Sequence, residues 1–295
     1  MILAAGLTPA WQQILVFPRF TAGEVNRAAE ALWCASGKVL NVGCAVLHLG
    51  APSHTLCLIG GDTGAAIRRD FAALGVPATW VETFVPTRVC TTILDRATGQ
   101  TTELVQNSGA VTNDELDRFA AAFGELAPRA SLVVLSGSLP DRTPSDFFHR
   151  LLERVRAPVL LDIRGAELRE CLPLKPWLVK PNRDELAATA GRALTTDGDL
   201  FAAMKELHAA GAEHVVVSDG PRTLWALGPD GIEHFTPPHV DVMNPIGCGD
   251  CLAAGLAVAH VEGRPWREGV TFGLSAAAEN ARHLLPGRIA RPVLV

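Results

Sequence analysis

The sequence predicts an α/β fold built around one largely parallel β-sheet. Short apolar runs alternate with amphipathic segments along nearly the whole chain, which is typical of repeated β-α units. The 295 residues are 48% hydrophobic and 19% charged, so the chain can bury a large core. Because one sheet of an α/β fold often organises about 250 residues, we expect residues 1–295 to form a single main domain.

The predicted strands and helices follow one another from the N-terminus. Apolar runs bounded by turn residues predict strands at 2–5, 55–59, 132–135, 159–162, 177–179, 214–217 and 223–227. Helical periodicity lies between them, at about 39–49, 63–74, 113–125, 143–156, 183–190, 197–210, 249–262 and 266–284. Many of these helical segments open with Asn, Asp, Thr or Pro, which are residues that begin helices.

Two stretches, about 12–34 and 84–106, break this alternation. Within the second stretch, residues 90–95 and 101–106 flank a short polar linker, as the strands of a hairpin do. We expect the two stretches to pair into a small sheet outside the core. Such a sheet would form a lid over the carboxyl ends of the main strands, where open α/β sheets bind ligands.

Charge and composition exclude several classes of partner. The net charge is −5 and no Lys/Arg-rich arm is present, so we expect no nucleic-acid partner. No apolar stretch reaches the roughly eighteen residues that a membrane-spanning helix needs, so we expect no membrane association. The seven cysteines are odd in number and irregularly spaced, which fits free thiols in a reducing compartment and predicts a cytoplasmic protein.

The most informative segment is the Gly-rich stretch 244–250. Gly247 and Gly249 allow successive amide groups to bend around one point, and the helix that follows turns its unpaired N–H groups and positive dipole end toward that point. This arrangement favours an anion. Asp250 lies beside it, where a carboxylate can take a proton from a hydroxyl that attacks a phosphoryl group. Taken alone, the segment would be interpreted as an ordinary turn with a capping Asp, and the rest of the sequence decides against that.

Three motifs in one order carry a resemblance to a known family. They are Ser136-Gly137-Ser138-Leu139-Pro140, Lys180-Pro181-Asn182-Arg183-Asp184-Glu185-Leu186 and Gly247-Cys248-Gly249-Asp250. With them, essentially the whole chain resembles a ribokinase-like (PfkB-type) carbohydrate kinase, closest to the 1-phosphofructokinase and tagatose-6-phosphate kinase branch. The resemblance implies a three-layer sandwich with a small β lid, and an ATP-dependent phosphotransferase that acts on a sugar hydroxyl.

The resemblance also implies roles on the phosphoryl-donor side. Gly247, Cys248 and Gly249 would hold the charge on the transferred phosphoryl group, and Asp250 would be the general base. Asn182 and Glu185 match an N-x-x-E motif whose carboxylate organises water around Mg²⁺, although a helix-capping pair is the alternative interpretation. Further matches to nucleotide-side positions are Lys180, Ser218, Gly220 and Asn280. A monovalent cation near the turn is compatible with the family, but no motif here indicates one.

The sugar side departs from the family pattern. Gly37, Lys38 and Asn41 match a Gly-Gly-Lys-Gly-x-Asn segment that binds the sugar, whereas Ser36 and Val39 replace glycines. A β-branched residue is poorly suited to a positive φ or to a close approach of the ligand. Val39 therefore predicts either ordinary backbone torsions here or a reshaped pocket.

Gln12 stands where this branch has an aspartate that accepts hydrogen bonds from two sugar hydroxyls. An amide cannot hold a diol as a carboxylate does, so we expect the preferred sugar to differ from those typical of the family.

Two arginines match segments that bind the phosphate of a phosphosugar. Arg88 belongs to the site itself, while Arg27 would reach across from a neighbouring subunit's lid; Ser138 would add a hydroxyl. The resemblance therefore implies a sugar-phosphate acceptor and a homodimer formed through the lid. Two alternatives stay open: a non-catalytic sensor of nucleotide or phosphosugar, and a kinase of an unphosphorylated sugar or nucleoside.

Overall fold

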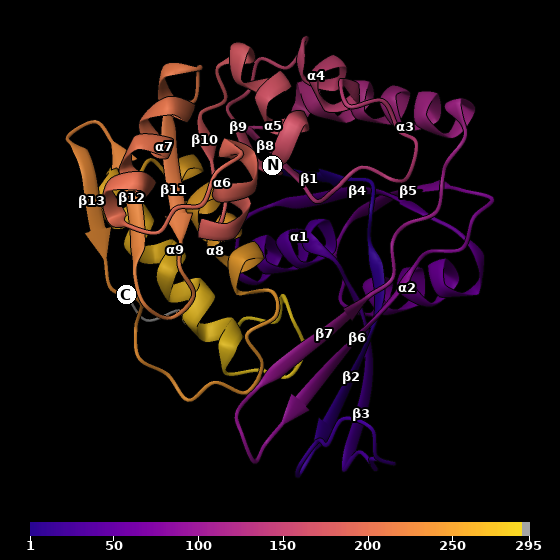
Figure 1. Cartoon of the computed structure of the whole chain (residues 1–295). Helices are drawn as coiled ribbons and strands as arrows, with labels where there is room; N and C mark the ends of the chain where they lie inside the picture. Colours follow the sequence, from indigo (N-terminus) through magenta and orange to yellow (C-terminus); the bar gives the residue numbers. More distant parts are fainter. Residues whose placement is uncertain (291–295) are drawn as a thin grey trace.

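The fold consists of a nine-stranded sheet covered by helices on both faces and a separate four-stranded sheet that projects from it (Figure 1). The structure is a computed structural model and describes residues 1–290. It confirms the predicted α/β fold with a largely parallel central sheet and a small β lid.

The main sheet has the strand order β13-β12-β11-β10-β9-β8-β1-β4-β5. Every neighbouring pair from β5 to β11 is parallel, and β12 and β13 form an antiparallel edge. The strands are β1 (Ile2–Gly6), β4 (Ser53–Ile59), β5 (Ala78–Glu82), β8 (Leu132–Ser136), β9 (Val159–Asp162), β10 (Leu178–Val179), β11 (His214–Ser218), β12 (Leu224–Gly228) and β13 (Gly231–Phe235).

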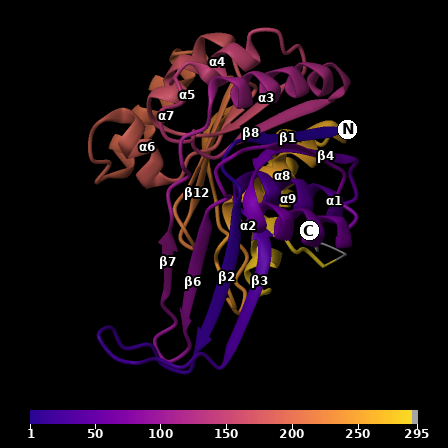
Figure 2. The same ribbon diagram turned by 90° about the vertical axis from the view of Figure 1, so that its right-hand side faces the viewer.

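Both faces of this sheet are buried because each central strand alternates its side chains between two hydrophobic clusters. In β1, Ile2 and Ala4 belong to one cluster and Leu3 and Ala5 to the other. The first cluster packs under α1 (Lys38–His48), α2 (Gly61–Ala73), α8 (Cys248–Val261) and α9 (Trp266–Ala281). The second packs under α3 (Asn113–Leu126), α4 (Phe147–Leu152), α5 (Gly165–Cys171), α6 (Arg183–Ala190) and α7 (Asp197–Ala209). The two groups of helices make the outer layers of a three-layer sandwich (Figures 1 and 2).

The sequence predicted every strand of the central part of the sheet, with ends within two residues of those observed. It missed β5 and β13, which are edge strands with only one fully buried residue each, and the short helix α5. The helix predicted at 143–156 is confined to Phe147–Leu152. The amides of Thr143 and Phe147 bond to carbonyls three residues earlier, so turns occupy the expected first turn of that helix.

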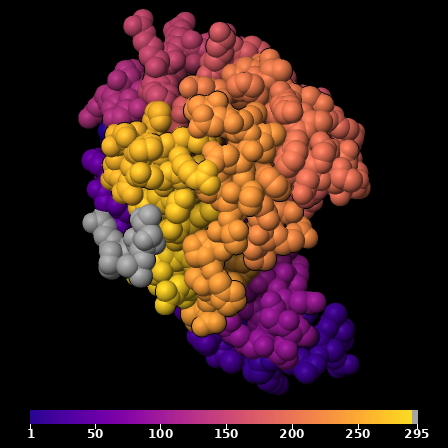
Figure 3. Space-filling view, turned by 90° about the vertical axis from the view of Figure 1, so that its left-hand side faces the viewer, coloured from indigo at the N-terminus to yellow at the C-terminus, as the bar shows by residue number. Residues whose placement is uncertain are grey.

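The lid is a four-stranded sheet in the order β3-β2-β6-β7. Its strands are β2 (Ala10–Phe17), β3 (Glu30–Ser36), β6 (Val89–Asp95) and β7 (Thr101–Val105), and the β6–β7 hairpin is as predicted. The strands β2 and β6 come from the two separate stretches and pair in parallel. Figures 2 and 3 show the lid extending away from the body of the molecule.

One face of the lid, which we call the inner face, packs on the main body. Ile14, Val16, Cys34 and Leu94 form a small cluster there that contacts Leu284 and Leu285 beyond α9. The lid is therefore fixed to the body through an apolar contact as well as through the chain. None of the helices within residues 1–290 has the length and apolar character needed to cross a membrane.

Two glycines, Gly255 in α8 and Gly273 in α9, allow these helices to approach closely. A Cβ added at Gly255 would lie 2.7 Å from the Gly273 Cα, so Gly255→Ala should lower the free energy of unfolding by about 1–3 kcal/mol. Gly124→Ala is the matched control, because nothing lies within 4 Å of its added Cβ on the exposed side of α3; it should raise stability by roughly 1 kcal/mol. Urea unfolding of both variants measures the difference, and equal effects would contradict this account of the packing.

Candidate active site

The Gly-rich turn lies at the N-terminus of α8, beside the carboxyl ends of the main strands. Gly247 is the residue before the helix and has φ 85°, a left-handed conformation that favours glycine. A Cβ at this position would also lie 2.8 Å from the Pro286 Cβ. The helix begins at Cys248, and the N–H groups of Gly249 and Asp250 in its first turn have no intrahelical acceptor. The turn therefore offers amide donors and a helix dipole to an anion.

Asp250 is held by a short chain of hydrogen bonds from the start of α1. The Asn41 Nδ2 donates to the Asp250 Oδ2 at 2.7 Å, and the Ser36 hydroxyl donates to the Asn41 Oδ1 at 3.1 Å. The second bond fixes the orientation of the Asn41 amide, so that its NH₂ group points to the carboxylate. Ser36, which replaces a family glycine, thus supports Asn41.

A buried ion cluster lies next to Asp250. The Lys38 Nζ contacts the Asp162 Oδ1 at 2.8 Å and the Glu185 Oε1 at 2.9 Å, and the Lys180 Nζ lies 3.3 Å from the Asp162 Oδ2. Asp162 and Lys180 are only 1% and 3% exposed. The Lys180 Nζ is also 3.6 Å from the point where a Gly249 Cβ would lie, which puts this ammonium beside the turn. The cluster brings positive charge to the place where the turn favours an anion.

Burial and charge set the protonation of these groups. Burial raises the pKa of Asp250 to about 6, with a further rise from Asp162; Lys38, the Asn41 hydrogen bond and Lys180 oppose it. Burial also opposes ionisation of Asp162, but Lys180 and Lys38 keep its pKa below the usual range. The neighbouring carboxylates outweigh burial at Lys38 and raise its pKa. At neutral pH, Asp250 is therefore ionised yet basic enough to accept a proton.

Asn182 and Glu185 form the helix-capping pair that was the alternative interpretation of their motif. The Asn182 side chain accepts from the Glu185 amide at 2.7 Å, and the Glu185 Oε2 accepts from the Asn182 amide at 2.9 Å at the start of α6. The same carboxylate contacts Lys38 through its other oxygen. Capping fixes Glu185 at the edge of the site, so the structural and the functional interpretations are compatible.

This site fits a magnesium ion held through water. Each Glu185 carboxylate oxygen has one protein partner and keeps a lone pair that can accept from a metal-bound water. Residues 1–290 contain no group of three His, Cys, Asp or Glu side chains that could hold a metal together. A Mg²⁺ ion here would take most of its ligands from water and phosphate, as Mg²⁺ commonly does.

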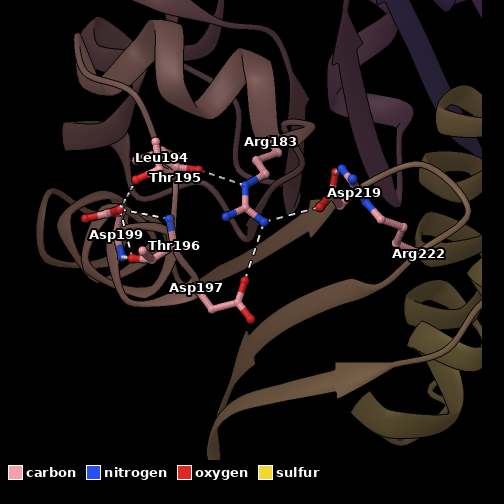
Figure 4. Close-up of polar contacts among 8 residues, drawn as sticks. All are labelled: Arg183, Leu194, Thr195, Thr196, Asp197, Asp199, Asp219 and Arg222. Carbon is pink, nitrogen blue, oxygen red and sulfur yellow. Dashed lines mark hydrogen bonds and ion pairs between the residues drawn. The ribbon is translucent and has the colours of Figure 1, made fainter.

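Ser218 and Gly220 lie at the end of β11, beside α6. Ser218 forms a parallel bridge with Asn182, and Gly220 has φ 59° in the turn that follows. Arg183 fastens this turn to α6, since its Nη1 lies 3.2 Å from the Asp219 Oδ2 and 3.4 Å from the Asp197 Oδ1 (Figure 4). Burial opposes ionisation of Asp219, but hydrogen bonds from Arg222 and Arg183 lower its pKa. The turn that carries Ser218 and Gly220 is thus held in place by a charged network.

Asn280 supports the Gly-rich turn from behind. Its side chain is fully buried, donates to the Ile246 carbonyl at 2.9 Å and accepts from the Gly287 amide at 2.8 Å. It also lies 3.4 Å from the Cys248 Sγ. These contacts make Asn280 a positioning residue for the turn, and its expected role on the nucleotide side stays a prediction.

The segment that contains Gly37 and Val39 has ordinary backbone torsions at Val39. Gly37 precedes α1 with φ 94°, and a Cβ there would lie 3.0 Å from the backbone of Pro9 and Ala10. Val39 lies inside α1 with a negative φ and a buried side chain, so its torsions are ordinary and no glycine is needed.

Gln12 lies on the inner face of the lid, 2% exposed. Its Nε2 donates to the Thr92 hydroxyl at 2.8 Å, in the neighbouring strand β6. The amide N–H that distinguishes Gln from Asp therefore has a partner within the lid, and the amide oxygen is the atom that corresponds to a carboxylate acceptor.

Thr8 links Arg88 and Ser138. The Arg88 guanidinium donates to the carbonyls of Thr8 and Pro9 at 3.0 and 3.3 Å, and the Thr8 hydroxyl donates to the Ser138 carbonyl at 3.1 Å. Arg88 thus braces the loop between β1 and β2. Arg27 is exposed in the loop between β2 and β3, and within residues 1–290 no hydrogen bond or ion pair joins it to the site.

Sequence reasoning missed several residues of this site. Asp162 ends a buried strand and carries the ion cluster, but a single strand-end Asp is a weak signal. Its position at the carboxyl end of a parallel strand is the feature that could have identified it. Thr8, Thr92 and the Arg183–Asp219 pair join segments far apart in the sequence, so no local pattern indicates them.

A known protein family and several solved structures are similar to this chain. A family model described as "pfkB family carbohydrate kinase" matches residues 11–288. Two crystal structures of phosphofructokinase-2 from Escherichia coli are each 26% identical to this chain. In the structure with substrates and products, 97% of this chain and 94% of that chain are covered and the TM-score is 0.87. In the structure with potassium, 98% and 96% are covered and the TM-score is 0.88.

Two Thermotoga maritima structures share the fold at lower identity. A protein described as a possible 1-phosphofructokinase is 22% identical, with 97% of this chain and 93% of that chain covered and a TM-score of 0.89. A ribokinase is 21% identical, with 97% and 95% covered and a TM-score of 0.76.

The hydrogen bond from Asn41 should hold down the pKa of Asp250. A hydrogen bond to a charged group contributes roughly 1.5–3 kcal/mol, so Asn41→Ala should raise that pKa from about 6 by about 1 to 2. Carboxyl ¹³C NMR during a pH titration measures it, with an Asp250→Asn sample to assign the signal. Ser36→Ala, which touches only Asn41, should give a smaller rise. An Asp250 pKa that Asn41→Ala leaves unchanged would contradict this role.

Proposed function

The chain belongs to the PfkB family of carbohydrate kinases, and we propose that it transfers the terminal phosphoryl group of ATP to a hydroxyl group of a sugar phosphate. Membership makes it a phosphotransferase with an alcohol group as acceptor. One observation carries the assignment of the chemistry: a buried carboxylate, with its pKa raised to about 6, lies in the first turn of a helix whose free amides favour an anion.

In this proposal Asp250 is the general base. It accepts the proton of the sugar hydroxyl as that oxygen attacks the phosphorus atom, and Asn41 holds the carboxylate in orientation through its 2.7 Å bond. Of the expected turn residues Gly247, Cys248 and Gly249, the Cys248 amide donates to the Pro245 carbonyl at 3.3 Å. In this proposal the amides of Gly249 and Asp250 donate to the oxygens of the transferred phosphoryl group. Lys180, beside Gly249, adds a positive charge in a site with little water, where such charges act strongly.

Glu185 acts on the nucleotide side of this site, and Lys38 contacts it from the sugar side. Glu185 would hold Mg²⁺ through water, and that ion would neutralise charge on the phosphates of ATP. Lys38 contacts both Asp162 and Glu185, so it ties the sugar-side helix α1 to the nucleotide-side helix α6. We also propose a monovalent cation near the turn, which the potassium in the Escherichia coli relative supports.

The acceptor we propose is a sugar phosphate of the fructose-phosphate class. The relative from Escherichia coli is a phosphofructokinase, which supports this class. Arg88 and Ser138 meet around Thr8 at the carboxyl end of β1, and a bound phosphate would compete for the guanidinium that now contacts backbone carbonyls.

The seven cysteines are all free thiols and six are buried, which supports a cytoplasmic location.

Asp250→Asn tests the proposed base. The variant keeps the shape of the residue but cannot accept the proton, so kcat should fall by roughly 10²–10⁴ while the Kd for Mg-ADP stays nearly unchanged. ADP release is measured over hexose phosphates, pentose phosphates, free sugars and nucleosides, with ADP binding by calorimetry.

The same screen decides between the remaining functions. Turnover of phosphosugars alone supports the proposal, whereas turnover of free sugars or nucleosides alone favours the unphosphorylated acceptor. Binding without turnover of any substrate favours a sensor. Undiminished turnover by Asp250→Asn would remove this carboxylate from the mechanism.

We propose in addition that two copies of the chain associate through the outer face of the lid. Trp33 and Leu104 are 44% and 55% exposed, and they lie in one row across that face with Gln13 and Thr91 between them. Trp11 stacks on Trp33 with ring centroids 5.9 Å apart, so the apolar surface is continuous. Exposed aromatic surface of this kind favours a protein partner, and Arg27 at the lid tip would then approach the other subunit's site.

Trp33→Glu should convert the dimer to a monomer, because it places a charge in the centre of the proposed contact. Light scattering after size-exclusion chromatography measures the mass. Val261→Glu, which changes a residue of similar exposure at the far end of α8, should leave the dimer intact. A monomeric parent protein would overturn both the dimer and the role of Arg27.

A further inference from the structure

A cavity of about 320 Å³ lies at the end of the main sheet opposite the active site. It is placed at the amino ends of three neighbouring strands, because Val159 begins β9, Trp177 directly precedes β10 and Glu213 directly precedes β11. Its volume falls in the range of about 300–1,000 Å³ that is typical of small-molecule sites. The active site uses the carboxyl ends of the same strands, so the two sites do not overlap.

The inner wall of the cavity is aromatic. The rings of Trp177 and His260 lie with their centroids 4.0 Å apart, and Trp177 is only 8% exposed. Burial, together with His214, lowers the pKa of His260 against the opposing charge of Glu213. The imidazole is thus neutral at neutral pH. The planes of the two rings are tilted by 38°, and together they form an uncharged aromatic wall against which a planar ring can pack.

The rim of the cavity carries two cations. Arg156 and Lys175 both line it and are exposed, and within residues 1–290 neither has an ion-pair partner. The one carboxylate of the lining, Glu213, lies 3.9 Å from the His214 ring. Unpaired cations at the mouth of a small cavity attract an anionic group.

Lys175 occupies a backbone conformation that normally belongs to glycine. Its φ and ψ are 54° and 60°, in the left-handed region, and it is one of two non-glycine residues with positive φ in the described chain. This conformation is unfavourable for a residue with a Cβ. A lysine in a place that glycine would fill better is accounted for by the ammonium group that it brings to the rim.

We propose that this cavity is a second ligand site for a small organic anion that carries a planar ring, coupled to the active site. The ring would lie against Trp177 and His260, and the anionic group would bind between Arg156 and Lys175. A phosphate or a carboxylate would satisfy the same two cations.

The coupling rests on three elements that the two sites share. Val159 and Asp162 are the two ends of β9, which is about 10 Å long. Trp177 and Lys180 flank β10, and His260 and Asp250 lie near opposite ends of α8. A ligand that displaces the cavity wall therefore acts on the elements that position Asp162, Lys180 and Asp250.

Calorimetric titration with 1-naphthyl phosphate tests the binding, with the active site filled by a non-hydrolysable ATP analogue and Mg²⁺. The parent protein should bind one equivalent. Inorganic phosphate and 1-naphthalenemethanol, which have only the anion or only the ring, should bind at least tenfold more weakly. The same titration with 2-naphthoate shows whether a carboxylate replaces the phosphate.

Lys175→Gly is the decisive variant, because glycine suits the backbone at this position and removes only the side chain. It should weaken binding of 1-naphthyl phosphate at least tenfold without lowering the melting temperature. Lys205→Gln removes an exposed lysine of α7 and should change nothing. Absent binding to the parent, or equal binding to Lys175→Gly, would overturn the site.

The coupling is measured as the change that one ligand causes in the Kd of the other. It rests on the proposed function only in that the protein must bind ATP. The Kd of the ATP analogue should change about fivefold or more when 1-naphthyl phosphate saturates the parent, and not in Lys175→Gly. An unchanged Kd would overturn the coupling. A parent that binds 1-naphthyl phosphate but not the ATP analogue would contradict the kinase assignment and leave the second site standing.

Discussion

The buried contact of Asp162 with Lys38 and Lys180 is the interaction on which the rest of the site depends. A carboxylate that is 1% exposed is tolerated only with charged partners, and these two lysines come from different elements. Lys38 lies at the start of α1 and Lys180 follows β10, so the requirement to pair Asp162 brings the start of α1 and the end of β10 to one point. Removing Asp162 would leave the buried Lys180 without its ion-pair partner, and removing either lysine would leave Asp162 with one charged partner instead of two.

The same cluster sets the chemistry of Asp250. Burial alone would raise the pKa of this carboxyl, and the nearby Asp162 adds to the rise, while the two lysines and Asn41 limit it. The result is a base that is ionised at neutral pH and still accepts a proton readily. Glu185 and Asn280 show how structural and chemical roles coincide in this site. Glu185 caps α6 and also contacts Lys38, and Asn280 supports the turn that precedes Asp250.

The sequence predicted the parts of this architecture that depend on local patterns. Gly247, Gly249 and Asp250 identify their turn by composition alone, and alternating apolar runs identify the buried strands. The edge strands β5 and β13 were not predicted, because few of their side chains are buried. The roles of Asp162 and of the Gln12–Thr92 pair were not predicted for another reason. Their importance comes from partners far away in the sequence, and only the folded chain brings these residues together.

The lid cannot assemble before much of the N-terminal half of the chain has been synthesised. Its strands β2 and β6 pair in parallel, and the Gln12–Thr92 bond between them spans 80 residues that include β4, α2 and β5. Pairing of such distant segments carries a large loop-closure entropy and is slow. Until β6 emerges from the ribosome, one edge of β2 stays unpaired, next to the apolar Ile14 and Val16. The nascent chain therefore passes through a stage at which the antiparallel pair of β2 and β3 carries an unpaired edge, which favours aggregation.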